Sequence, residues 1–231
     1  MYNGTLRDKD EIIDAVERLR KLGLRPHDHD MAKNWDLCRA VEFVTQMLPH
    51  DAPILDAGAR WSPFQSRLEQ LGYSDLWACD LKLSWREWFK RLIQKSGVRF
   101  VQCDLTRTPF SDGTFAAIAC LSVIEHGVNL QRYASEMARL LRPGGYLLTS
   151  TDFWTTPIDC RGIFPYGAEF GEMHVFTPEE LNDFVAMAGR YGLRPIEPLD
   201  LRCAERVVTW ERVDRSYTFT FFVMRKDASM G

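Results

Sequence analysis

Residues 53–72 read PILDAGARWSPFQSRLEQLG, and this stretch organises the rest of the chain. It opens with a short apolar run, passes through a glycine, and continues after Ser62 and Pro63 with apolar residues at helical spacing. The pattern predicts a strand, a tight turn and a helix, since Ser62 can cap a helix, Pro63 fits its first position and Gly72 suits a left-handed C-terminal cap. The free N–H groups at this helix start face the carboxyl end of the strand. Anionic or zwitterionic ligands bind at that place in open α/β sheets.

The same alternation continues along the chain. Strands are predicted at residues 76–81, 98–105, 115–124 and 146–151, helices at 83–97 and 129–141, and two closing strands at 199–203 and 217–224. Amphipathic helices are predicted at residues 8–22 and 31–48, and a capping box at Thr177 followed by Pro178 predicts another helix to about residue 191. Strands that alternate with helices at this spacing predict a doubly wound α/β sheet.

Composition narrows the function classes. The chain has 231 residues, of which 45% are hydrophobic, so one large globular domain is expected. The net charge of −3 and the lack of a long Lys/Arg cluster argue against a duplex nucleic acid partner. The six cysteines show no metal-binding spacing and predict reduced, mostly buried thiols in a cytoplasmic protein. No window approaches the roughly 20 apolar residues that span a bilayer, so we expect no membrane insertion.

Acidic residues follow successive predicted strands. They are Asp56, Asp80 and Asp104, and the fourth strand is followed by Glu125 and His126. A carboxylate about 20 residues after the strand-turn-helix glycine can accept both hydroxyl protons of a ribose diol, and Asp80 has this spacing. A single Asp at a strand end often only caps a turn. Three on consecutive strands, all facing one sheet edge, favour a nucleoside ligand.

Residues 27–30 read HDHD, which resembles a set of metal ligands. No further ligand cluster lies nearby in the sequence, and Asp30 is well placed to cap the next helix. The sequence therefore favours a capping role for this segment over a metal site, and no resident metal is expected.

Four stretches resemble class I S-adenosylmethionine-dependent methyltransferases. They are ILDAGARWSPF from Ile54, ACDL from Ala78, VQCDLTRTPFSDGTFAAIACLSVIEH from Val101 and EMARLLRPGGYLLTSTDFW from Glu136, with FTPEEL from Phe176 as added support. The resemblance implies a Rossmann-like sheet of seven strands, mostly parallel with an antiparallel last strand, and helices on both faces. It implies one domain, with N-terminal helices at 1–50, a cofactor-binding half at 51–151, an acceptor loop at 152–176 and a closing helix and strands at 177–226.

The resemblance also implies binding of S-adenosylmethionine and its product S-adenosylhomocysteine. The implied cofactor residues are Asp56, Ala57 and Gly58 at the methionine end, Asp80 and Leu81 at the ribose, Asp104 and Leu105 at the adenine, and Leu121 at the start of a wall, residues 121–125, beside the sulfonium. The sequence departs from the family pattern at Arg60 and Ser62, where further glycines are usual. A dinucleotide needs those glycines because its pyrophosphate approaches the backbone, so the departure argues against a nicotinamide-dependent reductase.

The reaction and acceptor are less defined. The amino-group methyltransferase motif Asn/Asp-Pro-Pro-Tyr is absent after the fourth strand, where the chain reads LSVI, so a hydroxyl acceptor is favoured. A hydroxyl must lose a proton, and the candidate catalytic residues are His126, His174 and Asp152. A divalent metal held by Asp152, Asp159 and Glu172 is an alternative way to acidify the hydroxyl.

Residues 152–174 interleave aromatic and acidic side chains, a mixture that suits sugar C–H faces and hydroxyls. The aromatic members are Phe153, Trp154, Phe164, Tyr166 and Phe170, and the acidic members are Asp152, Asp159, Glu169 and Glu172. We therefore expect O-methylation of a sugar or glycan, and the tail also resembles methyltransferases of bacterial surface-polysaccharide biosynthesis. The alternatives are a small-molecule (natural product) methyltransferase, a loop that only covers the cofactor, and a non-catalytic module that binds S-adenosylmethionine. The sequence does not define the oligomeric state.

Overall fold

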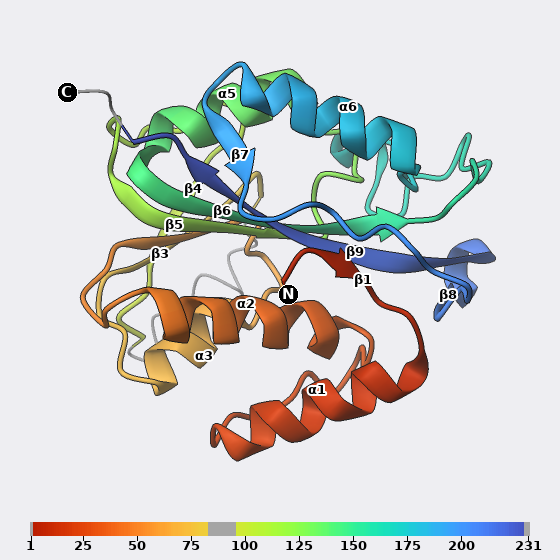
Figure 1. The fold of residues 1–231 in the computed structure, drawn as a ribbon, viewed down its shortest axis with the longest axis horizontal. Coiled ribbons are helices and arrows are strands. Elements are labelled where there is room, and N and C mark those ends of the chain that lie inside the picture. The colour runs from red at the N-terminus through yellow and green to blue at the C-terminus, as the bar shows by residue number, and fades with distance from the viewer. Residues whose placement is uncertain (1, 83–95, 229–231) are drawn as a thin grey trace.

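A computed structural model describes residues 2–82 and 96–228 of the chain, so the helix expected at residues 83–97 falls mostly outside the described residues. The described residues form one twisted sheet between two layers of helices (Figure 1). Its parallel strands are β2 (Ile54–Ala57), β3 (Leu76–Asp80), β4 (Arg99–Gln102), β5 (Phe115–Leu121) and β6 (Leu141–Phe153), and β9 (Arg215–Lys226) runs antiparallel to β6. The order along the sheet is β1-β9-β6-β5-β2-β3-β4, where β1 is Gly4–Thr5.

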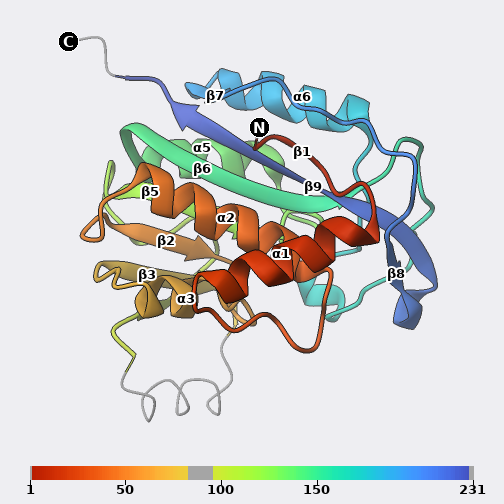
Figure 2. The same cartoon turned by 60° about the horizontal axis from the view of Figure 1, so that its bottom comes forward.

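Helices cover both faces of the sheet. On one face lie α2 (Lys33–Met47) and α3 (Phe64–Gln70), with α1 (Lys9–Lys21) packed on α2 (Figure 2). On the other face lie α5 (Leu130–Leu140) and α6 (Pro178–Gly189) (Figure 1). The apolar side chains form two buried clusters, one containing Trp35, Phe43 and Phe64 and the other containing Phe115, Tyr133 and Phe184. Among the described residues, no helix is both long enough and apolar enough to cross a membrane.

Side-chain caps lie at the starts of α1, α5 and α6, whereas α2 begins after Ala32 without one, so Asp30 does not cap it as expected. Asp8 accepts the N–H of Glu11 at the start of α1, and Thr177 forms a full capping box with Glu180 at the start of α6, with Pro178 in the first turn. The expected turn before α3 is also present, since the Ser62 hydroxyl accepts the N–H of Phe64 at 3.2 Å and Gly72 ends the helix with φ +91°. However, α3 begins one residue later than expected, at Phe64 instead of Pro63.

The doubly wound, mostly parallel sheet with an antiparallel last strand is confirmed, but some edge elements differ from expectation. Residues 199–203 are not a strand; their alternating LDLRC pattern resembles a half-buried strand, yet only Asp200 forms a single bridge, to Gly4. Instead, β7 (Leu193–Pro195) and β8 (Val208–Trp210) pair with β9. These elements and β1 have only two or three residues, which is too short for an alternating pattern to be recognised.

The register of the parallel strands brings their carboxyl ends to one edge. Asp56 on β2 lies opposite Ala78 and Ala119, and Asp80, the last residue of β3, lies opposite Gln102 on β4. Residues that follow these strands therefore meet in space, as the positions of the three aspartates predict.

Candidate active site

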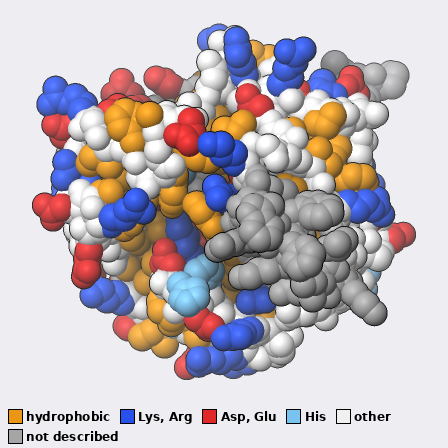
Figure 3. Space-filling view, turned by 180° about the vertical axis from the view of Figure 1, so that it is seen from behind, with side chains coloured by type: hydrophobic (Ala, Val, Ile, Leu, Met, Phe, Trp, Pro, Cys, Tyr) orange, Lys and Arg blue, Asp and Glu red, His pale blue; other side chains and the backbone are white. Residues whose placement is uncertain are grey.

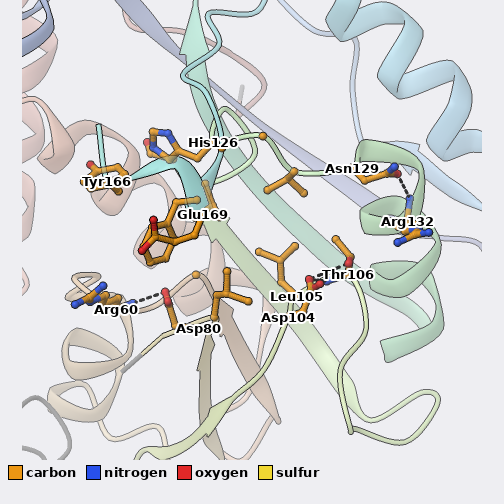
Figure 4. Close-up of a pocket in the computed structure, with 18 of the residues that line it drawn as sticks. Arg60, Asp80, Asp104, Leu105, Thr106, His126, Asn129, Arg132, Tyr166 and Glu169 are labelled. Atoms are coloured by element: carbon orange, nitrogen blue, oxygen red, sulfur yellow. Dashed lines mark hydrogen bonds between the residues drawn. The ribbon is translucent and has the colours of Figure 1, made fainter. Parts of the chain in front are cut away.

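A cavity of about 470 Å³ opens at the carboxyl ends of β2, β3, β4 and β5 (Figure 4). Its volume falls in the range of ordinary ligand pockets, roughly 300–1,000 Å³. The residues predicted for the cofactor that line it are Gly58, Asp80, Leu81, Asp104 and Leu105. Asp56 and Ala57 are buried below its surface, and Leu121 packs against the core, so these three do not line the cavity.

Asp80 presents its carboxylate at the end of β3. Its Oδ2 accepts the backbone N–H of Arg60 at 3.1 Å, and its Oδ1 accepts the backbone N–H of Lys82 at 3.2 Å. Burial raises the pKa of Asp80, while these main-chain hydrogen bonds oppose the rise. Since each carboxylate oxygen has two lone pairs, both oxygens can accept a further hydrogen bond from a ligand.

Asp104 shapes the opposite end of the cavity. Its Oδ1 accepts hydrogen bonds from the N–H and the hydroxyl of Thr106, both at 2.8 Å, which fixes the turn after β4 and places Leu105 on the cavity wall. Arg132 of α5 lines the same end, next to Asn129, which caps that helix by accepting the Arg132 N–H at 3.0 Å (Figure 4). Arg132 was not predicted from the sequence, because it looks like an ordinary exposed residue of an amphipathic helix whose opposite face packs in the core.

Gly58 allows the backbone to approach the wall after β5. Its φ is +86°, and a Cβ at this position would lie 2.4 Å from Cγ2 and 2.9 Å from Cγ1 of Val123. Real Cβ atoms do not approach other atoms so closely. Any side chain here would press on Val123 and narrow the cavity that both residues line.

His126 lines the cavity together with Tyr166 from the acceptor loop, and their ring centroids are 4.9 Å apart in an edge-on arrangement (Figure 4). Burial, together with the nearby Lys33 ammonium, lowers the pKa of His126 to about 4. The imidazole is therefore neutral at pH 7. It can accept a hydrogen bond from a ligand, but it holds a proton weakly.

Tyr166 is the centre of an aromatic group around the cavity. Its ring centroid lies 5.1 Å from that of Trp61 and 6.0 Å from that of Trp210. Trp61 is 58% exposed although it is large and apolar, and it lines the cavity with Tyr166. Trp61 and Tyr166 can therefore offer flat surfaces to a ligand, whereas Trp210 contacts Tyr166 but does not line the cavity.

A group of buried charges lies behind Ser122, which lines the cavity just after β5. Its three carboxylates, Asp36, Glu125 and Asp152, are each 2% exposed or less. The Lys33 ammonium lies near all three carboxylates and donates a hydrogen bond to the Ser122 hydroxyl. Burial raises the pKa of each carboxylate, that of Asp152 to about 7, whereas Lys33 lowers them.

The loop at residues 152–176, which the sequence predicts to bind the acceptor, contacts the turn after β5 through its main chain. A Cβ on Gly171 would lie 2.7 Å from the Cα of Gly127 and 2.8 Å from the carbonyl oxygen of His126. Met173 forms a bridge with His126, and the His174 N–H donates to the Glu125 carbonyl at 2.8 Å. Glycines at positions 127 and 171 therefore let two backbones touch beside the cavity.

The other predicted catalytic residues do not join His126 in the cavity. Asp152 belongs to the buried group, where it hydrogen bonds with Tyr217. His174 lines a neighbouring cavity beside α6 and pairs with Glu180 at 3.0 Å. The sequence placed both near the acceptor, but the fold directs Asp152 into the sheet interior and His174 towards α6.

The acceptor-loop residues divide in the same way. Only Tyr166, Glu169 and Phe170 of the predicted aromatic and acidic set line the cavity. Phe153 is buried in the core, Trp154 packs on the core with the Arg206 guanidinium 4.9 Å from its ring centroid, and Phe164 is exposed. Asp159 pairs with Arg161, and Glu172 accepts the Gly162 N–H. Within residues 2–82 and 96–228, no three His, Cys, Asp or Glu side chains are grouped so that they could hold a metal ion. This applies to the HDHD segment and also to the set Asp152, Asp159 and Glu172.

The cavity fits S-adenosylmethionine. Asp80 offers two oxygens that can each accept a ribose hydroxyl, and Gly58 leaves the space a Cβ would fill. Leu105 and Thr106 give the other end a mixed apolar and polar wall.

Comparison with known proteins agrees with this geometry. Residues 55–149 match the family model described as a methyltransferase domain. An uncharacterised methyltransferase of Mycobacterium sp. (strain JLS) is 27% identical over 154 residues, which cover 67% of this chain and 56% of that protein. The chain thus spans little more than half the length of this relative.

Solved structures share the fold. The 1,6-didemethyltoxoflavin-N1-methyltransferase of Burkholderia thailandensis, with 1,6-didemethyltoxoflavin and S-adenosylhomocysteine bound, has 20% identity and a TM-score of 0.58, covering 96% of this chain and 92% of that one. The geranyl diphosphate C-methyltransferase of Streptomyces coelicolor A3(2), in complex with Mg²⁺, geranyl diphosphate and S-adenosylhomocysteine, has 18% identity and a TM-score of 0.60, covering 86% and 84%. Residues 55–149 thus match a methyltransferase domain, and the sheet has the fold of S-adenosylmethionine-dependent methyltransferases of known structure.

Proposed function

We propose that this domain transfers the methyl group of S-adenosylmethionine to a hydroxyl of a small polar acceptor, and that the acceptor is a sugar or the end of a glycan. One observation carries the proposal: the cofactor residues Asp80 and Asp104 line the same cavity as Ser122, His126 and Tyr166. A bound cofactor and an acceptor would therefore share one continuous space.

When bound, S-adenosylmethionine supplies a methyl group that its sulfonium already activates. The chain's own residues mainly have to position the reactants, and good alignment can supply up to roughly 7–11 kcal/mol of the barrier reduction. Asp80, Gly58 and Leu105 would hold the cofactor, and Tyr166 and Trp61 would orient the acceptor.

The sugar assignment rests on the walls near His126. Tyr166 and Trp61 provide flat rings against which the C–H face of a sugar can stack, and Glu169 adds a carboxylate on the same loop. Acidic and basic side chains are interspersed with hydrophobic areas on the described part of the face in Figure 3, which is compatible with a neutral polar acceptor.

A flat natural product is the second candidate acceptor. The rings of Trp61 and Tyr166 would also suit a planar heterocycle or a prenyl chain. Structural neighbours include methyltransferases named for 1,6-didemethyltoxoflavin and geranyl diphosphate. A third possibility, a module that binds the cofactor without turnover, is distinguished by assaying methyl transfer directly.

The cofactor part of the proposal is tested by calorimetric titration with S-adenosylhomocysteine. Asp80→Ala should weaken binding about tenfold to a hundredfold, because each lost charge-assisted hydrogen bond is worth roughly 1.5–3 kcal/mol. Asp75→Ala is the matched control, since Asp75 lies just before the same strand, away from the cavity, where it pairs with Arg99. Equal affinities of wild type and Asp80→Ala would refute the ribose assignment.

The acceptor part is tested by following methyl transfer to a panel of free sugars, nucleotide-linked sugars, catechols and prenyl diphosphates. Methylation of a sugar hydroxyl is expected. Transfer only to catechols or prenyl diphosphates would favour the natural-product alternative, and cofactor binding without any transfer would favour the binding module.

A further inference from the structure

The Ser122 hydroxyl connects the cavity with a buried carboxylate. Ser122 lines the cavity, and its Oγ donates to Oδ2 of Asp36 at 3.3 Å. Ser150 donates to the same Oδ2 at 2.6 Å, so its hydrogen is already engaged with Asp36. Lys33 donates to Oγ of Ser122. A hydroxyl oxygen has two lone pairs, and Lys33 occupies one, which leaves the second for a donor in the cavity.

The backbone holds Ser122 in an unusual conformation. Its φ is +53°, one of only two positive values among the described residues other than glycine. The Ser122 N–H donates to the carbonyl oxygen and to Oγ of Ser150, both at 3.0 Å, which fixes this conformation. Residues other than glycine that hold such a backbone conformation are concentrated at functional sites. In Ser122, this conformation places the hydroxyl between the cavity and Asp36.

His126 is poorly suited to keep the proton of an acceptor hydroxyl. Its pKa of about 4 lies far below the neutral range in which a general base works best. Asp36 is 2% exposed, and burial raises its pKa towards that range. Groups that face Asp36 are Lys33 on its own helix, Asp30 in the preceding loop, Ser122 after β5, and Ser150 and Asp152 on β6.

We propose that Ser122 relays the proton of the acceptor hydroxyl to Asp36, with Lys33 holding the Ser122 oxygen in place. The proposal rests on the hydroxyl acceptor proposed above and names the residues that serve it. The acceptor O–H bond breaks as its oxygen bonds to the methyl carbon, and the electron pair of the broken C–S bond stays on sulfur. The acceptor proton passes to Oγ of Ser122, and the original Ser122 proton passes to Oδ2 of Asp36. Asp36 returns a proton through Ser122 to water after the product leaves.

The relay is tested with Ser122→Gly and Asp36→Asn, assayed on the sugar of the acceptor panel that the wild type methylates fastest. Glycine at position 122 removes the hydroxyl and tolerates the positive φ, so the variant keeps the backbone. Both substitutions should lower kcat about 10²–10³-fold, within the usual contribution of proton transfer, and leave S-adenosylhomocysteine affinity within about threefold. The matched control is Thr151→Val, which removes a buried hydroxyl next to Ser150 that bonds Glu125 instead. It should keep kcat within about threefold.

The pH profile separates a relay from a structural role. In the wild type, kcat should fall at low pH as Asp36 becomes protonated, and Asp36→Glu should keep this acid limb while Asp36→Asn loses it. The relay is wrong if the wild type methylates a hydroxyl and Ser122→Gly stays within about threefold of it; the proposed function then stands. If the wild type binds S-adenosylhomocysteine but methylates no hydroxyl, the hydroxyl acceptor itself is wrong and the relay falls with it.

Discussion

Gly58→Ala tests how tightly the turn after β2 packs against Val123, which follows β5. The new Cβ would lie 2.4 Å from Cγ2 of Val123, so Val123 or the backbone must shift. Overpacking of this kind costs about 1–3 kcal/mol. The substituted residue must also keep φ near +86°, and this left-handed conformation costs a residue other than glycine about 1–2 kcal/mol more. Urea denaturation should therefore show a loss of about 2–5 kcal/mol in unfolding free energy, and calorimetry should show weaker binding of S-adenosylhomocysteine.

The double variant Gly58→Ala/Val123→Ala separates the cost of overpacking from the cost of the positive φ. Val123→Ala removes both Cγ atoms that clash and leaves the φ term unchanged. Relative to the sum of the single variants, the double variant should recover about 1–3 kcal/mol, the overpacking term. An unfolding free energy of Gly58→Ala within about 0.5 kcal/mol of the wild type, the usual spread of neutral substitutions, would refute the reasoning. Strict additivity of the two substitutions would also refute it.

Three further expectations concern His126 and α6. His126→Gln should lower kcat only about tenfold, which corresponds to the loss of one hydrogen bond, and the fall of kcat at low pH should remain. If kcat fell more than a hundredfold and its decrease at low pH disappeared, His126 would be the base. Because the folded-state pKa of His126 is about 4 and the unfolded value about 6.5, its neutral burial destabilises the fold as pH falls from 6.5 towards 4. When the pH is lowered from 7 to 5, the unfolding free energy of His126→Gln should therefore rise by about 2 kcal/mol relative to that of the wild type. If urea titrations gave the same difference between the two proteins at both pH values, the lowered pKa would be contradicted. Thr177→Ala removes the capping box of α6 and should cost about 1 kcal/mol, seen as a Tm lower by roughly 2–4 °C, whereas the exposed Thr209→Ala should leave Tm unchanged.

Local patterns were sufficient to predict the central sheet and several residues that line the cavity at its carboxyl edge. The run before Gly58, the caps of α3 and α6 and the acidic residue that ends β3 all depend on neighbours within a few positions. Asp80 was identified because its place follows from strand order and spacing. Whether these residues bind the cofactor stays a prediction.

The charged group behind the cavity could not be predicted. Asp36 and Ser122 are 86 positions apart, Lys33 and Ser122 are 89 apart, and Asp36 and Ser150 are 114 apart. In the sequence, Lys33 and Asp36 look like ordinary polar residues at the start of an amphipathic helix. Only the packing of α2 on the sheet places them behind the end of β5.

The contact between Gly127 and Gly171 links two segments that are far apart in the sequence. With main chain against main chain and no side chains between them, the acceptor loop cannot slide or tilt without displacing the carbonyl of His126. Under the proposed function, a movement of residues 152–176 that admits an acceptor would also move the His126 carbonyl beside the cavity. We therefore expect a larger residue at either glycine to separate the two main chains, and so to change acceptor entry and the position of His126 together.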